Sequence, residues 1–446
     1  MKGLLFTYLV TSGGVAGGLF NPFYGLLAYV VLAIVKPESM WPWAVTSGRY
    51  SLAVALAMMI GWTYSKRATF QSGSGGTVLA LLFAFFAWAG LGALFAPNQD
   101  AAWLFIETFA KIVIPIFIGL TTIDSVAKLK QLAWCIAITQ GYVAFEMNLS
   151  YFQGYNTLAT EGFGALDNNS AAIALVTALG LTFFLGLHAE SLFAKGLAFG
   201  LAALMGHAVL FSYSRGGMMA MLVSGAAAFV MIPKRPKHYA AFALAACLGF
   251  YLAGAEVRER FASSFASKNG EREASAQSRV DLWRDCWDVM DHHPIMGCGP
   301  NQWPLIAPKY GWPIGKEAHS LWMQTGAELG FPGLGLLAGF YLLCMFRCWR
   351  LTWKRTAVSD PWLIVTARMV VVSLAGFCVA AQFVSLEALE IPYYVALLGC
   401  GTLKLHSTQK QLTNDERSND EGMPNLEVPT DERISNDECR SVSVSV

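Results

Sequence analysis

Residues 209–222 read VLFSYSRGGMMAML and place one arginine between two long apolar runs. A cation costs roughly 2.5–3.5 kcal/mol to insert into a membrane helix, so Arg215 should have a partner or a function. Gly216 and Gly217 leave space beside it, and the next helix would start here with free N–H groups and the positive end of its dipole. A forked cation at a helix start suits a phosphate. The pattern favours an anion site, and a snorkelling arginine at the membrane surface is the alternative.

Three further ionisable residues suit proton transfer or phosphate binding. His319 lies in GKEAHSLWMQTGAELGFPG, where a polar stretch returns to an apolar one. Its ordinary pKa of about 6.5 suits a general base, with an interfacial polar residue as the alternative. Arg279 lies in a polar stretch that contains tryptophans. Lys111 follows Glu107 by four residues, so it either forms an ion pair on one helix face or faces a cavity and meets an anionic group.

A polar cluster that could contact sugar hydroxyls precedes another apolar run. Asp167, Asn168 and Asn169 lie in GALDNNSAAIAL, and at least one of them is expected to cap a helix. A cap that faces a cavity could also contact a glycan. The remaining candidates for contact with a glycan or the cavity are Tyr213, Asn301 and Glu328.

The composition decides which class of protein has to position these residues. The chain has 446 residues, of which 55% are hydrophobic and only 14% are charged. A soluble domain carries about 25% charged residues, and apolar runs of about 18–22 residues recur along this chain. These features indicate a polytopic membrane protein. The net charge of +1 gives no sign of nucleic-acid binding.

Hydrophobic runs predict about twelve to thirteen membrane helices, the first two of which are short and could form one hairpin. The predicted segments are 3–20, 22–36, 50–64, 77–96, 102–121, 130–147, 169–188, 192–212, 216–233, 238–254, 320–346, 363–383 and 387–404. We therefore expect an all-α fold, a polytopic transmembrane helix bundle with one long periplasmic loop that contains short amphipathic helices.

The loops that carry lysine and arginine set the orientation, because cationic loops stay in the cytoplasm. Four clusters agree with one alternating path, and they contain Lys66, Arg67, Lys128, Lys130, Lys234, Arg235, Lys237, Arg347, Arg350, Lys354 and Arg355. This path puts Arg215 at the outer end of its helix. It divides the chain into membrane helices over 1–254, a periplasmic loop over 255–318, membrane helices over 319–404 and a cytoplasmic tail over 405–446.

The loop and the tail differ in what they can bury. In the loop, SRVDLWRDCWDVMDHHP predicts a helix capped by Ser278 and stopped by Pro294, with its aromatic side on the membrane surface. The tail repeats an acidic and basic theme with few apolar residues, which predicts disorder. Cys286 and Cys298 share the loop and could form a disulfide, although spacing alone cannot establish the geometry.

Several common catalytic motifs are absent from the sequence. It contains no P-loop, no GxSxG, no HExxH, no CxxC and no DxD cluster. His292 and His293 are adjacent, which is a poor arrangement for binding one metal ion. We therefore predict no metal and no cofactor. Chemistry on an already activated, membrane-borne substrate fits better than nucleotide-sugar chemistry in the cytoplasm.

Four blocks in this order resemble the O-antigen ligase/polymerase family. They read LDNNSAAIAL, SYSRGGMMAM, SRVDLWRDCWDVMDHHPIMGCGPNQW and EAHSLWMQTGAELGFPGLGLL. The opening NPFYGLLAYVVLAIVKPESMWPW resembles the subgroup of O-glycosylation ligases associated with the exosortase system. The likeness covers about residues 10 to 405.

The resemblance implies a membrane glycosyltransferase of lipopolysaccharide or polysaccharide biosynthesis in the bacterial inner membrane, with its active site facing the periplasm. Its donor would be a glycan on undecaprenyl diphosphate, and its acceptor a hydroxyl of a lipid, a protein or a polysaccharide. By resemblance His319 is the catalytic residue, and Arg215, Arg279 and Lys111 bind the diphosphate. The expected transfer inverts the anomeric carbon without a metal, because the base directs the hydroxyl against the opposite face. A polymerase of the same superfamily, or a transporter or flippase for an anionic lipid-linked substrate, is the alternative.

Overall fold

The computed structural model describes residues 1–421, except 47, 66–68, 233–234, 237–238, 241, 245–246, 248–250, 252–273, 354–357, 359 and 386–387. The chain forms two compact units, Met1–Thr408 and Gln409–Val446. Across the described residues the fold is all-α, with only an isolated bridge between Phe163 and Leu166, so the predicted fold class is confirmed.

The helices follow the hydrophobic runs closely. They are α1 (Lys2–Phe20), α2 (Pro22–Val35), α3 (Pro37–Met40), α4 (Tyr50–Tyr64), α5 (Gly73–Phe95), α6 (Gln99–Thr122), α7 (Val126–Phe152), α8 (Thr157–Thr160), α9 (Asn168–His188), α10 (Leu192–Phe211), α11 (Arg215–Met231), α14 (Ala274–His292), α15 (Trp303–Ile306), the 3₁₀ turn η1 (Ala307–Tyr310), α16 (Leu321–Leu351), α17 (Pro361–Ala380) and α18 (Glu390–Glu421).

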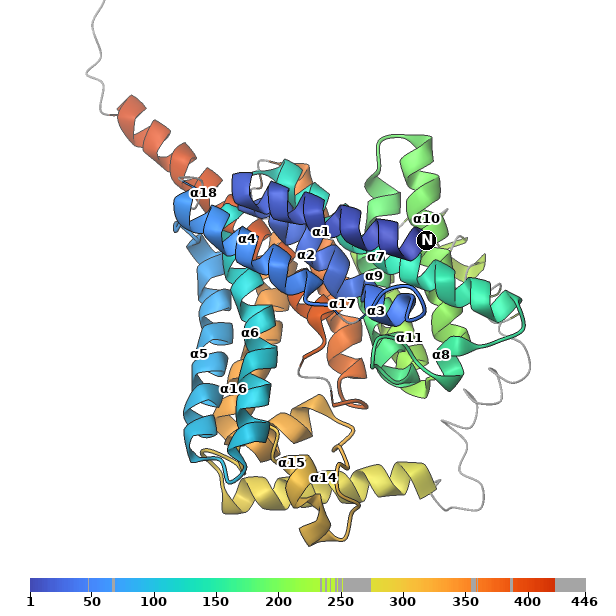
Figure 1. Cartoon of the computed structure of the whole chain (residues 1–446). Helices are drawn as coiled ribbons and strands as arrows, with labels where there is room; N and C mark the ends of the chain where they lie inside the picture. The colour runs from blue at the N-terminus through green and yellow to red at the C-terminus, as the bar shows by residue number, and fades with distance from the viewer. Residues whose placement is uncertain are drawn as a thin grey trace, which may run out of the picture. The chain divides into compact units, whose positions relative to one another are not determined.

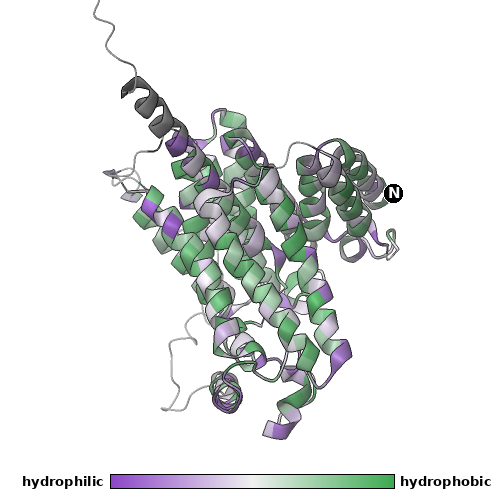
Figure 2. Ribbon diagram, turned by 90° about the vertical axis from the view of Figure 1, so that its left-hand side faces the viewer, coloured by the Kyte–Doolittle hydropathy of each residue, from purple (hydrophilic) through white to green (hydrophobic). Residues whose placement is uncertain are grey.

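Eight of the described helices are long and apolar enough to cross a membrane. They are α1, α2 continued through α3, α5, α6, α9, α10, α16 and α17, while α4 and α11 are apolar but shorter. Hydrophobic residues predominate along the long helices in Figure 2. Most of the predicted segment 238–254 lies outside the described residues. The chain is a multi-pass membrane protein.

Helices α5, α6 and α16 run side by side, and α14 lies across their ends (Figure 1). Helices α1 and α2 are separate elements that meet at Asn21 and pack on α4. The approach to α4 is close enough that a Cβ on Gly61 would lie 2.0 Å from the carbonyl oxygen of Gly18. Small residues at such crossings let helix backbones pack closely in a membrane.

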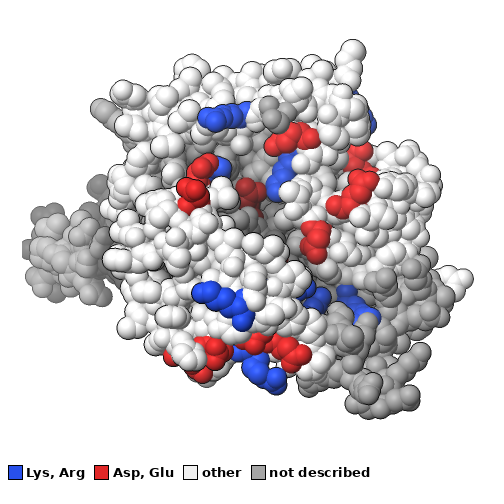
Figure 3. Space-filling model, turned by 60° about the horizontal axis from the view of Figure 1, so that its bottom comes forward, with Lys and Arg blue, Asp and Glu red and all other residues white. Residues whose placement is uncertain are grey.

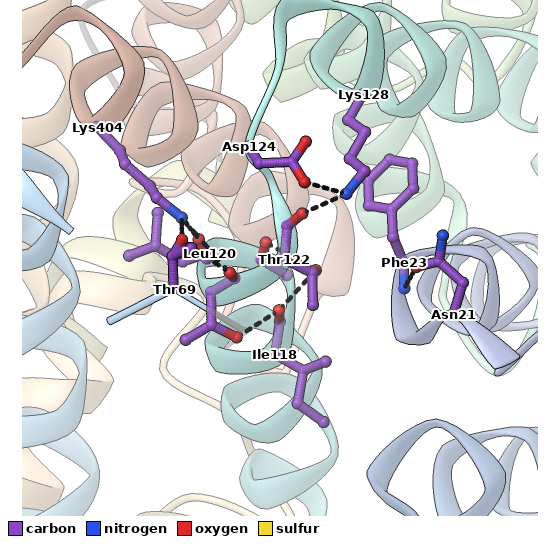
Figure 4. A network of polar contacts seen from close by, with 11 residues as sticks. Asn21, Phe23, Thr69, Ile118, Leu120, Thr122, Asp124, Lys128 and Lys404 are labelled. Carbon is purple, nitrogen blue, oxygen red and sulfur yellow. Dashed lines mark hydrogen bonds and ion pairs between the residues drawn. The ribbon is translucent and has the colours of Figure 1, made fainter. Parts of the chain in front are cut away.

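Two lysines cap the C-terminal end of α6 (Figure 4). The Nζ of Lys404 donates to the carbonyl of Leu120 at 2.7 Å and to Oγ1 of Thr69 at 2.8 Å. The Nζ of Lys128 donates to the carbonyl of Thr122 at 2.8 Å and pairs with Asp124 at 2.7 Å. The last carbonyls of a helix lack partners within it, so these ammonium groups satisfy them and tie α6 to α7 and α18.

The helix of the loop differs from its prediction at its start and in what it packs against. It begins at Ala274, so Ser278 is inside the helix and is not its cap. Its apolar face, with Leu282 and Cys286 fully buried, packs on Trp303 and Ala327. Helices α15 and α16 therefore cover Leu282 and Cys286, whereas Trp287 is 49% exposed, and its contact with the membrane surface stays a prediction.

Helix α18 continues through Glu421, past the boundary predicted at 404. Its continuation is physically reasonable because residues 402–421 contain no proline or glycine to end the helix. The rest of the predicted tail, 422–446, lies outside the described residues.

Candidate functional site

The asparagine block and the arginine block are joined directly. The Nδ2 of Asn168 donates to the carbonyl of Ser212 at 2.9 Å, and Oγ of Ser214 donates to Oδ1 of Asn169 at 2.8 Å. Asp167 caps α9 by accepting from the Ser170 amide at 2.8 Å, as the sequence predicted. The starts of α9 and α11 are therefore anchored to each other, and Arg215, the first residue of α11, is held beside the cap of α9.

The two glycines after Arg215 serve helix packing. A Cβ on Gly217 would lie 2.7 Å from Cβ of Ala172, and one on Gly216 would lie 3.3 Å from Cβ of Phe383. The space beside these residues is therefore filled by protein, so the prediction that it admits a ligand was wrong. The amide of Gly217 also donates to Oγ of Ser214 at 3.0 Å, which occupies one of the helix-start N–H groups that were expected to meet an anion.

His319 is fixed by both of its neighbours. Ala318 accepts a hydrogen bond from the Trp283 indole of α14 at 3.1 Å, and its amide donates to Gln324 at 3.1 Å. The amide of Ser320 donates to Ser385 at 3.2 Å. Between these anchors His319 has a φ of 50°, a left-handed conformation that costs energy for any residue with a Cβ. Such strain persists where the surroundings enforce it, often at functional sites.

Charged residues from three elements act on the His319 imidazole. Partial burial lowers its pKa below the ordinary value, Lys316 and Arg279 lower it further, and Asp167 opposes them. The imidazole is therefore neutral at pH 7 and can accept a proton. Burial also opposes ionisation of Asp167, but hydrogen bonds from Ser170 and Asn169 and the charge of His319 keep the pKa of its carboxyl below the ordinary value.

Hydrogen bonds link the turn that carries Arg215 to Asp167. Arg215 adjoins Ser214, which bonds to Asn169, and Asn169 donates to Oδ2 of Asp167 at 3.1 Å. Asp167 and Arg279 both act electrostatically on His319. On the face seen in Figure 3, charged side chains of both signs gather around a recess. The structure thus brings Asp167 and Arg279 near enough to His319 to influence its pKa, and it bonds the turn of Arg215 to the segment of Asp167.

Lys111 is engaged elsewhere on α6. Its Nζ lies 2.9 Å from Oε1 of Glu107, and the two side chains are 55% and 69% exposed. The predicted ion pair is therefore confirmed. The backbone carbonyl of Lys111 accepts from the hydroxyl of Tyr29 at 2.8 Å, which fixes this part of α6 against α2.

Glu328 and Asn301 dock the loop on the helices. Glu328 is 2% exposed, and its Oε2 accepts from the Asn301 amide at 2.6 Å while Oε1 accepts from the Trp303 amide at 3.3 Å and from Gln324 at 3.3 Å. Asn301 has a φ of 56° and donates through Nδ2 to the carbonyl of Ala101 in α6 at 3.3 Å. The carboxylate thus supplies acceptors to a loop whose own amides would otherwise be buried without partners.

Helix α16 is broken where this loop meets it. Pro332 lacks an N–H and cannot bond to the carbonyl of Glu328, and Gly330 has a φ of 67°. The amide of Gly299 donates to the Glu328 carbonyl instead, at 2.9 Å, and the amide of Cys298 donates to Ala327 at 2.8 Å. The loop therefore completes the hydrogen bonding of the broken helix, which fixes both relative to His319.

The remaining predicted residues of the site have local roles in the described contacts. Tyr213 lies in the turn before α11 with a φ of 55° and packs, like Leu210, against Met218. Cys286 and Cys298 are free thiols, so the disulfide is not formed, and burial raises the pKa of both thiols well above the ordinary value. Within the part of the chain that the structure describes, no group of three His, Cys, Asp or Glu residues is arranged to hold a metal ion.

Lys36 is a residue that the sequence reasoning missed. It ends α2 in a left-handed conformation, and its Nζ donates to the carbonyl of Gly164 at 2.9 Å. Gly164 belongs to the tight turn of residues 162–166 that leads into Asp167, so Lys36 positions the cap of α9. The lysine before Pro37 was a visible helix-end signal, but its partner lies 128 residues away.

Comparison with known proteins assigns two segments of the chain to families. Residues 200–338 match the family described as O-antigen ligase. Residues 1–167 match a family of unknown function. No protein of curated function matches the chain. The first match contains Arg215, Arg279 and His319, and the second ends at Asp167. These four residues therefore come from both segments.

Proposed function

The chain belongs to the O-antigen ligase family through residues 200–338, and from this premise we propose that it transfers a glycan from undecaprenyl diphosphate to an acceptor hydroxyl. Membership implies a membrane enzyme of the ligase or polymerase type with a lipid-linked donor and an acceptor. We propose further that the reaction takes place at the periplasmic face of the inner membrane. The observation that carries the proposal is the anchoring of three segments: the left-handed turn of His319 is bonded to α14, which carries Arg279, and the turn before Arg215 is bonded to Asn169, which in turn bonds to Asp167.

In this proposal His319 is the general base. Its neutral imidazole accepts the proton of the acceptor hydroxyl as the oxygen attacks the anomeric carbon. The carboxylate of Asp167 then stabilises the imidazolium that forms, because a negative charge nearby favours the protonated ring. A positioned base typically contributes about 10²- to 10⁴-fold in rate.

Arg215 and Arg279 hold the diphosphate of the donor. As the bond from the anomeric carbon to the phosphate oxygen breaks, its electron pair passes to the leaving diphosphate, which gains negative charge. Guanidinium groups fixed in advance in a site with little water stabilise that charge strongly. The new bond forms on the opposite face of the sugar, so the product has inverted configuration. Lys111 is paired with Glu107 in the structure but its side chain is 55% exposed, and we propose that it also contacts the diphosphate when the donor binds.

The polar residues around the base complete the proposed site. Asp167, Asn168, Asn169, Tyr213 and Asn301 are proposed to contact the glycan or the cavity that holds it, and Glu328 supports them through the loop. No step requires a metal ion, because the arginines supply the positive charge and His319 removes the proton. We therefore expect full activity after treatment with a chelator.

The test uses the purified protein in lipid nanodiscs with a radiolabelled undecaprenyl-diphosphate glycan and candidate acceptors. The variant His319→Ala should lose transfer by about 10²-fold or more. The matched control His292→Ala removes an exposed histidine of α14, bonded to the Asp288 carbonyl, and should retain it. Full activity in a folded His319→Ala protein would refute the assigned base. Labelled lipid crossing proteoliposomes without a new glycosidic bond would support a transporter instead, and a glycan acceptor would identify a polymerase.

A further inference from the structure

A second hollow lies between α3, the C-terminal half of α7 and the turn before α9. It has a volume of about 420 Å³, is partly open to solvent, and is lined by residues that include Trp43, Glu146, Ser150, Gln153 and Glu161. All of these residues belong to the segment that matches the family of unknown function. This volume is within the range of about 300–1,000 Å³ typical of ligand sites.

The lining suits a ligand with many hydroxyl groups and no negative charge. Two carboxylates, an amide and hydroxyl groups face the hollow, and no lysine or arginine is among its described lining residues. Like charges repel, so the Glu161 carboxylate opposes a phosphate here, while Lys2, 3.6 Å from Glu146, offsets part of the charge of the second carboxylate. Carboxylates accept hydrogen bonds from hydroxyls, and an amide both donates and accepts. The indole of Trp43, 80% exposed, offers an apolar face with a polar edge to the C–H side of a sugar ring.

Both carboxylates are held in place before any ligand arrives. The hydroxyl of Tyr142 donates to Oε1 of Glu146 at 2.5 Å, and that of Tyr155 donates to Oε1 of Glu161 at 2.5 Å. The described residues make no hydrogen bond to Oε2 of either glutamate, so each retains an acceptor. Ser150 is fixed as well, because it bonds to the Tyr155 carbonyl at 2.6 Å. Groups fixed in advance lose little entropy on binding, which favours affinity.

The hollow adjoins the site around His319 through one tight turn. Gly162, which lines the hollow, is so close to the end of its own turn that a Cβ on it would lie 1.9 Å from the Leu166 carbonyl oxygen and 3.0 Å from Cα of Asp167. Asn156, at the start of α8, donates to the carbonyl of Phe211 at 2.8 Å, four residues before Arg215. The wall of the hollow is therefore joined to the segments that carry Asp167 and Arg215.

We propose that this hollow is a saccharide subsite that binds an uncharged sugar residue of a glycan whose reacting end lies at His319. The identity of the ligand as a glycan rests on the proposed function. The segment before Asp167 would then supply glycan recognition, while the O-antigen ligase segment supplies the diphosphate ligands and the base. The bound sugar belongs to the donor or to the acceptor glycan, and the kinetics below distinguish the two.

The test measures binding separately from transfer. The probe is the soluble oligosaccharide released by mild acid from the lipid-linked donor, titrated calorimetrically into protein in nanodiscs, since maltoside detergents would compete for the hollow. We expect Trp43→Ala to weaken binding about tenfold, the effect of losing one aromatic contact. Glu161→Gln should weaken it too, because the amide replaces one acceptor by a donor. The matched control Trp353→Ala removes another exposed indole, 44% exposed and close to Arg350, and should bind as the wild type does.

Unchanged affinity in both pocket variants would overturn the subsite and leave Trp43 as an aromatic anchor at the membrane surface. If the variants raise the KM for the donor, the sugar is the donor's; if they raise the KM for a glycan acceptor, it is the acceptor's. His319→Ala should bind the oligosaccharide normally while failing to transfer it. A wild-type protein that binds the oligosaccharide but never transfers it would refute the proposed function and leave the subsite standing.

Discussion

Replacing Glu328 with alanine should release the loop that completes the broken helix α16. The substitution removes the acceptors of the Asn301 and Trp303 amides, at 2.6 and 3.3 Å. A buried amide left without a partner costs about 1–3 kcal/mol. Trp303 is fully buried and Asn301 is partly exposed, so we take the full cost for the first and a reduced one for the second. The sum is about 2–4 kcal/mol of local stability.

Hydrogen exchange measured by mass spectrometry tests this value directly. A loss of about 2–4 kcal/mol raises the exchange rate of the loop amides about 30- to 700-fold. The expected increase is confined to peptides that cover residues 294–303 and the middle of α16. Transfer should fall as well, because the same loop packs against α14, which carries Arg279 and holds Ala318 through Trp283.

The matched control is Glu190→Ala, which removes an 88% exposed carboxylate whose nearest cation, Lys130, is 3.7 Å away. Exposed pairs of this kind contribute about 0–1 kcal/mol, so exchange should not change measurably. Loop peptides of Glu328→Ala that exchange at the wild-type rate in a folded protein would refute the assignment of Glu328 as the anchor of the loop.

Two further predictions concern the base and the end of α6. Transfer should be lost as pH falls through the pKa of His319, because only the neutral imidazole accepts a proton. Asp167→Asn removes a charge that raises this pKa, so it should shift the acidic limb of the pH–rate profile to lower pH. Arg279→Gln removes a charge that lowers the pKa, so it should shift the limb to higher pH. Shifts in the same direction would contradict the electrostatic arrangement. Lys404→Met should lower the free energy of unfolding by about 1–3 kcal/mol, measured as a lower Tm in detergent. The reason is that Lys404 is 3% exposed and its loss leaves the Leu120 carbonyl without its donor. An unchanged Tm would show that water replaces the ammonium group.

The sequence by itself determined the class of the protein and the course of most helices. Hydrophobic runs of membrane length are local features, so the segments predicted at 50–64, 169–188 and 192–212 agree with α4, α9 and α10 to within one residue. Capping is equally local, so a cap could be predicted among Asp167, Asn168 and Asn169; the structure identifies it as Asp167, whose carboxylate bonds to an amide three residues ahead. The four blocks that resemble the O-antigen ligase family identified the candidate residues, because the resemblance depends only on residue types and their order along the sequence.

The tertiary structure decided what each candidate touches. Backbone carbonyls and amides carry no signature in the sequence, so neither the bond of Lys36 to Gly164 nor the anchoring of two loop amides by Glu328 could be predicted. The packing of the glycines after Arg215 could not be predicted either, because the residues that fill their space, Ala172 of α9 and Phe383 after α17, are far away in the sequence. Burial, charge and packing depend on residues far apart in the chain, and only the folded arrangement brings them together.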